Sequence, residues 1–72
     1  MPLDWLIEIR KNKEFTQLEV AIGAKISRNY LSEIENGLKR PSVTVAQAIG
    51  EFLGFDWVIF FEGKSRETQH TA

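Results

Sequence analysis

The chain has no cysteine and a single histidine, His70, which lies in a polar stretch close to its end. Without cysteine, neither a disulfide framework nor a thiolate zinc site can form. The sequence also has no glycine-rich phosphate loop and no grouping of a nucleophile with a base. We therefore expect no enzymatic activity, no metal and no cofactor.

Long apolar runs are also missing, since none approaches the roughly 18 residues that a membrane span needs. The first residues include Asp4 and Glu8 and lack the basic segment and apolar core of a secretory signal. We therefore expect a cytoplasmic protein. Its 72 residues make one small domain, which dimerisation would help to stabilise, because a chain of this size buries only about 60% of its unfolded surface.

A strong excess of positive charge is absent as well, because the formal net charge is −1. The charges are nevertheless unevenly distributed. Residues 10–40 hold seven lysines and arginines against four glutamates, a net of +3, and the remainder of the chain carries −4. A molecule with one basic and one acidic flank can be oriented on a polyanion by its local field, so the charge does not exclude a nucleic-acid partner.

The spacing of apolar residues predicts four helices, over residues 3–12, from 17 to 23 or 24, over 28–35 and over 43–53. Thr16, Ser27 and Ser42 are suited to cap the last three, and Gly37 and Gly54 are suited to follow helix ends. The residues expected to face inward around the second and third helices are Val20, Ala21, Ala24, Ile26, Leu31 and Ile34.

The segment 55–61 is consistent with two structures. With Asp56 as N-cap, Trp57, Phe60 and Phe61 lie at helical spacing and give a short fifth helix, whereas the aromatic and β-branched content would also suit an edge strand. We favour the helix. We expect the domain to cover residues 1–63 and the polar residues 64–72 to form a flexible tail.

The second and third predicted helices are joined by a short turn. The six inward-facing residues given for them above match the internal packing of a helix-turn-helix. From about Leu6 to Phe61 the chain resembles the lambda-repressor-like, Cro-type family of bacterial and phage regulators, also called the XRE family. The resemblance rests on Phe15-Thr16-Gln17, Ile26-Ser27-Arg28, Leu31-Ser32-Glu33-Ile34-Glu35-Asn36-Gly37 and Arg40-Pro41-Ser42. It implies a compact all-α fold of five helices, with the second and third forming the helix-turn-helix.

One position departs from the family pattern. Members usually have glycine in the turn where this chain has Lys25, at a place that often needs a positive φ. If Lys25 does not take up this conformation, Gly23, two residues earlier, would instead end the second helix early.

The resemblance also implies roles for individual residues. The start of the third helix would read bases in the major groove through Arg28, Asn29, Ser32 and Glu33. Phosphate contacts would come from Gln17, Ser27, Tyr30, Asn36, Lys39 and Arg40. In similar repressors an arginine late in the first helix pairs internally with a glutamate late in the third, which corresponds here to Arg10 and Glu35.

These expectations describe a phage-type or mobile-element repressor that binds double-stranded operator DNA as a homodimer, in the bacterial cytoplasm and at the nucleoid. Apolar surface around Val58, Ile59 and Phe60 would form the dimer interface. One alternative is an antitoxin whose hydrophobic C-terminal segment binds a toxin protein while the helix-turn-helix regulates its own operon. Another is a protein-interaction module that has lost DNA binding.

Overall fold

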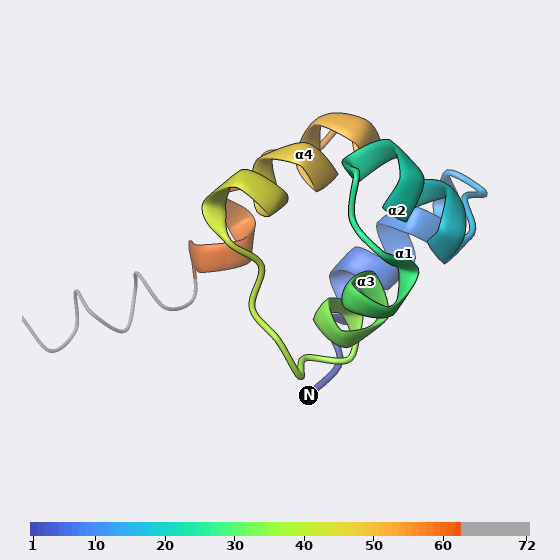
Figure 1. The fold of residues 1–72 in the computed structure, drawn as a ribbon. Helices are drawn as coiled ribbons and strands as arrows, with labels where there is room; N and C mark the ends of the chain where they lie inside the picture. Colours follow the sequence, from blue (N-terminus) through green and yellow to red (C-terminus); the bar gives the residue numbers. More distant parts are fainter. Residues whose placement is uncertain (63–72) are drawn as a thin grey trace, which may run out of the picture.

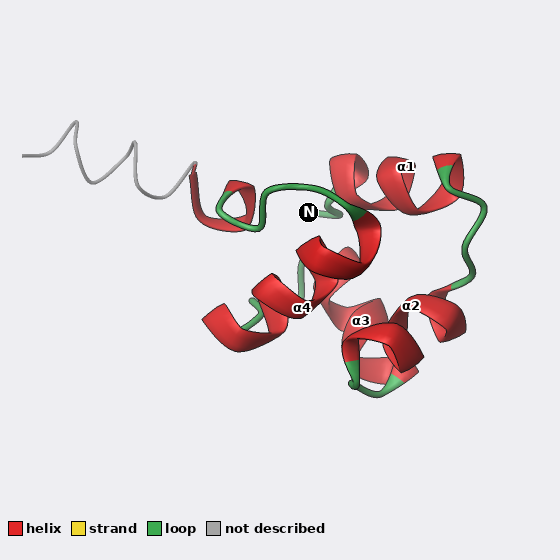
Figure 2. Ribbon diagram, turned by 90° about the horizontal axis from the view of Figure 1, so that it is seen from above, coloured by secondary structure: helices red, strands yellow, loops and turns green. Residues whose placement is uncertain are grey.

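The structure, a computed structural model, describes residues 1–62. It contains α1 (Asp4–Asn12), α2 (Gln17–Ala24), α3 (Arg28–Glu35) and α4 (Val43–Leu53), followed by a helical segment at residues 59–62 (Figure 1). The part of the chain described has helices and loops but no strand (Figure 2), which confirms the predicted all-α fold. None of these helices is long and apolar enough to cross a membrane. The tail predicted for residues 64–72 lies outside the described residues.

Local capping signals explain where the helices begin. The Thr16 hydroxyl accepts from the Glu19 backbone N–H at 3.1 Å, and the Glu19 carboxylate accepts from the Thr16 backbone N–H at 2.8 Å, which is a complete capping box. Ser27 and Ser42 each accept from the backbone N–H three residues later, at 3.0 and 3.2 Å. Each cap satisfies a backbone donor that the helix itself cannot, so the predicted starts of α2, α3 and α4 are confirmed.

A single core joins the four helices, because α2 packs against both α3 and α4 while α1 lies against α3. The core consists of the buried side chains of Leu6, Val20, Ala21, Ala24, Leu31, Ile34, Ile49 and Leu53. Five of the six inward positions predicted for the helix-turn-helix belong to it, and the sixth, Ile26, is half-buried against it. The core therefore holds α2 and α3 in a defined relation to each other.

The turn between α2 and α3 has the left-handed conformation at Lys25, with φ 61° and ψ 41°. The expectation that Gly23 ends α2 early is wrong, because the helix continues through Ala24. The Lys25 backbone N–H donates to carbonyls of the last turn, which closes the helix at this point. Gly23 serves packing instead, since a Cβ there would overlap the ring of Phe52 from α4.

The segment after α4 is helical, so the alternative of an edge strand is wrong. The Asp56 carboxylate accepts from the Val58 backbone N–H at 3.1 Å at the start of the turn. The helical turn directs the ring of Phe60 onto Trp5 of α1 and onto Phe55, with ring centroids 5.0 and 5.7 Å apart. Packing against α1 therefore decides a choice that β-propensity left open.

Candidate nucleic-acid interface

Four polar side chains form one strip along α3. Arg28 and Asn29 are exposed at the start of the helix, and Ser32 and Glu33 are half-buried one turn later. Residues four apart on a helix are neighbours, so the two pairs lie side by side. Leu31 and Ile34 are fully buried on the opposite side of the helix. The strip is thus fixed to face away from the core.

The residues after α3 turn back onto the last turn of this helix. The backbone N–H groups of Leu38 and Lys39 donate to the Glu33 carbonyl at 2.9 and 3.3 Å. The Lys39 ammonium lies 3.5 Å from the Glu33 carboxylate, and the Lys39 and Glu33 side chains are 59% and 30% exposed. An exposed pair of this kind contributes only about 0–1 kcal/mol, so it can open when another partner approaches. Sequence reasoning missed this pair, which depends on how the chain turns at Gly37, where φ is 77°.

The other residues predicted to contact phosphate occupy different environments. The Ser27 hydroxyl is used as the cap of α3, and Tyr30 is half-buried against the core. Asn36 is exposed, and its amide nitrogen lies 3.4 Å from the Ser32 hydroxyl. Arg40 is exposed and has no ion pair within residues 1–62. Arg40 therefore keeps its full charge available at the surface.

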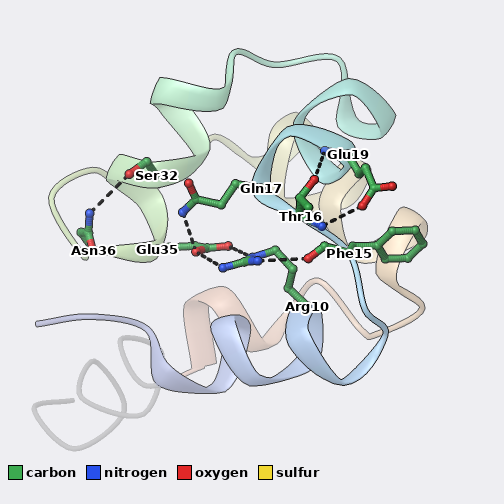
Figure 3. A network of polar contacts seen from close by, with 8 residues as sticks. All are labelled: Arg10, Phe15, Thr16, Gln17, Glu19, Ser32, Glu35 and Asn36. Carbon is green, nitrogen blue, oxygen red and sulfur yellow. Dashed lines mark hydrogen bonds and ion pairs between the residues drawn. The ribbon is translucent and has the colours of Figure 1, made fainter.

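A polar network lies where α1, α2 and α3 meet (Figure 3). Arg10 donates two hydrogen bonds to the Glu35 carboxylate, from Nε to Oε2 at 2.7 Å and from Nη2 to Oε1 at 3.1 Å. The third guanidinium nitrogen, Nη1, donates to the Phe15 carbonyl at 3.0 Å. Glu35 is only 2% exposed, so its charge depends on these donors. The structure thus brings together the two residues expected to form an internal ion pair.

Gln17 belongs to the same network, which the sequence did not indicate. Its side-chain Nε2 donates to Glu35 Oε1 at 2.9 Å, so the amide expected to contact phosphate is anchored inside the protein (Figure 3). Gln17 remains half-buried, at the first position of α2. The capping box involves the backbone N–H groups of Thr16 and Glu19, so it does not use the backbone N–H groups of Gln17 and Leu18.

The apolar residues predicted to form a dimer interface differ in exposure. Val58 is 42% exposed, Ile59 is half-buried, and the half-buried Phe60 has its ring on Trp5 and Phe55. Other large apolar side chains are exposed elsewhere, at Met1, Leu18, Ile22, Leu38, Val43 and Phe52. Phe60 therefore serves the chain's own packing, and Val58 is the member of the predicted patch most available to a partner.

Comparison with known proteins agrees with this geometry. The helix-turn-helix family model matches residues 6–60, so the chain belongs to that family and the resemblance found in the sequence is confirmed. The chain is 54% identical over 68 residues to the uncharacterized HTH-type transcriptional regulator YqaF of Bacillus subtilis (strain 168), covering 94% of this chain and 90% of that protein. It is 39% identical over 46 residues to the immunity repressor protein of Bacillus phage phi105, covering 64% of this chain and 32% of the phage protein.

Proposed function

We propose that the protein is a sequence-specific DNA-binding transcriptional regulator, acting as a repressor, which reads operator half-sites in the major groove with α3. The observation that carries this proposal is the strip formed by Arg28, Asn29, Ser32 and Glu33, which faces away from the buried Leu31 and Ile34. The names of the two relatives, a transcriptional regulator and a phage immunity repressor, support the same function.

The strip has the donors and acceptors that base recognition needs. The Arg28 guanidinium can bond O6 and N7 of a guanine, and the Asn29 amide can pair with N6 and N7 of an adenine. Glu33 can accept from the amino group of a cytosine once it leaves Lys39, 3.5 Å away. Each well-formed bidentate pair contributes about 1–3 kcal/mol of discrimination against other bases.

Phosphate contacts fix such a domain on the duplex without reading its sequence. Lys39 and Arg40, exposed in the loop after α3, supply the charge for these contacts, and Gln17, Ser27, Tyr30 and Asn36 supply neutral donors. Residues 10–40 carry a net charge of +3, which favours approach to a polyanion despite the overall charge of −1. Binding of this kind weakens as salt concentration rises.

Selection of binding sites from random duplex DNA tests this proposal. We expect Arg28→Ala to lose discrimination at particular base pairs of the selected operator. Arg40→Ala, at an exposed arginine with no ion pair within residues 1–62, should bind all operator variants more weakly by a nearly equal factor. An unchanged sequence preference in Arg28→Ala would show that α3 does not read bases as proposed. Failure of the wild-type protein to enrich any DNA sequence would overturn the function itself.

We also propose that the protein acts as a homodimer. One domain covers a single half-site, and two domains related by a two-fold axis read half-sites about 34 Å apart. The interface is proposed around Val58, Ile59 and Phe60, with the exposed Val58 at its centre. Val58→Glu should shift the mass in solution towards the monomer, whereas Val43→Glu, a control at another exposed valine, should not. A wild-type monomer at micromolar concentration, with and without operator, would contradict this interface.

The alternative of an antitoxin gains nothing from the relatives, since their names describe a transcriptional regulator and an immunity repressor. A regulator that binds bacterial or phage operators acts in the cytoplasm, so we place this protein there, at the nucleoid. Salt-dependent binding to duplex DNA separates the regulator from a pure protein-interaction module, which would show none.

A further inference from the structure

Glu35 is the last residue of α3, and its carboxylate contacts two other helices (Figure 3). It accepts from Arg10 of α1 at 2.7 and 3.1 Å and from Gln17 of α2 at 2.9 Å. With 2% of its surface exposed, the side chain has little freedom to move away from these donors. The contact with Gln17 does more than complete a buried ion pair, because it holds a half-buried residue of α2 in place.

The contact also determines how the Gln17 amide is oriented. A carboxylate only accepts hydrogen bonds, so Gln17 must turn its Nε2 group, and not its carbonyl oxygen, towards Glu35. One Nε2 hydrogen is used there, at 2.9 Å between the heavy atoms, and the other makes no hydrogen bond within residues 1–62. A glutamine free in solution would lose rotamer freedom on binding a partner, whereas this one has lost it already on folding.

Arg10 neutralises the negative charge that Glu35 places beside Gln17. An unpaired carboxylate beside Gln17 would repel a phosphate group at short range. The two-pronged contact between Arg10 and Glu35 makes the pair neutral overall, so the amide can meet an anion while anchored to one.

We propose that Glu35 is a positioning residue for DNA binding, which holds the Gln17 amide so that its second Nε2 hydrogen meets a phosphate oxygen when α3 lies in the major groove. This inference rests on the proposed function. Because Glu35 is part of α3, the phosphate contact made from α2 is kept in register with Arg28 and Asn29, the base-reading residues of the same helix. The buried network thus links phosphate docking to base reading.

A double-mutant cycle on operator affinity tests the link. The background is Arg10→Met with Glu35→Met, which replaces the pair by apolar side chains of similar length and often preserves folding. Because a hydrogen bond to a charged group is worth about 1.5–3 kcal/mol, Gln17→Met should weaken operator binding about 12- to 160-fold in the wild type. The background variant should already bind the operator more weakly than the wild type, by a similar factor. Adding Gln17→Met to it should then lower operator affinity by less than about twofold more. Gln47→Met, at an exposed glutamine of α4, is the matched control and should leave operator affinity unchanged both in the wild type and in the background.

The same factor for Gln17→Met in both backgrounds would overturn the inference, because Gln17 would then act independently of Glu35. Thermal melting of each variant serves as the control that it is folded at the assay temperature. The loss should be uniform across operator base-pair variants, since phosphate contacts carry no sequence information. Selective loss at particular base pairs would assign Gln17 to base reading and contradict the proposal.

A second measurement needs no substitution. In the wild-type protein, the side-chain amide hydrogens of Gln17 should exchange with solvent more slowly than those of Gln47, and one of them should shift in the NMR spectrum when the selected operator is added. Equal exchange for the two glutamines would refute the anchoring. If the wild-type protein selects no operator at all, the proposed function fails; if it binds its operator but the cycle is additive, only this inference fails.

Discussion

Replacement of Arg10 by alanine should destabilise the protein severely. The substitution removes both hydrogen bonds to Glu35 and the bond to the Phe15 carbonyl. It leaves the Glu35 carboxylate, whose side chain is 3% exposed, with Gln17 as its single side-chain donor within residues 1–62. A buried charge that loses its partner costs roughly 3–5 kcal/mol. In the intact protein both partners are shielded from water, since the Arg10 side chain is itself only 11% exposed.

That cost is large for so small a domain. At roughly 0.05–0.15 kcal/mol per residue, the whole chain has a free energy of unfolding of about 4–11 kcal/mol. A loss of 1 kcal/mol lowers the melting temperature of such a domain by about 4–8 °C, so Arg10→Ala should lower it by roughly 12–40 °C. If the free energy of unfolding lies at the lower end of this range, the variant should be partly unfolded at 25 °C.

Thermal unfolding followed by circular dichroism measures this effect. Lys11→Ala, at the neighbouring exposed lysine, is the control and should change the free energy of unfolding by no more than about 0.5 kcal/mol. Arg10→Met combined with Glu35→Met should recover most of the stability, because no charge is left stranded. Small and equal effects of Arg10→Ala and Lys11→Ala would refute the reasoning and show that the pair is not energetically coupled.

Three further substitutions test the local structure, each by thermal or denaturant unfolding. Lys25→Gly should stabilise the protein by about 0.5–1 kcal/mol, because relief of the left-handed φ of 61° outweighs the flexibility of glycine in the unfolded chain; a loss of stability would contradict this. Gly23→Ala should destabilise it by roughly 1–3 kcal/mol, although alanine favours helix, because the new Cβ overlaps Phe52; a gain would refute this packing. Thr16→Ala should cost about 1 kcal/mol by breaking the capping box with Glu19, and no change would mean that the box is not formed in solution.

Prediction from sequence succeeded where the determining interactions are local. Thr16, Ser27 and Ser42 act on backbone groups three residues away, so the starts of α2, α3 and α4 could be assigned directly. It was less successful where a glycine had two possible roles. Gly23 was expected to end a helix, but its role is to admit the ring of Phe52 from another helix, which no local pattern reveals.

The same distinction applies to the candidate site. The helical period places Arg28, Asn29, Ser32 and Glu33 on one strip opposite the apolar residues, whatever the rest of the chain does. The pairing of Glu33 with Lys39 and the anchoring of Gln17 on Glu35 required the structure, because the partners lie on different segments.

By itself, the sequence determined the helices, their caps, the side of α3 that is free of the core, and the family to which the chain belongs. These follow from interactions within a few residues and from a periodic apolar pattern. Only the tertiary structure decided that the segment after α4 is helical, that Lys25 rather than Gly23 closes α2, and that one buried carboxylate holds three helices together. The physical reason is that these outcomes depend on distances between segments, which core packing sets and local propensity does not.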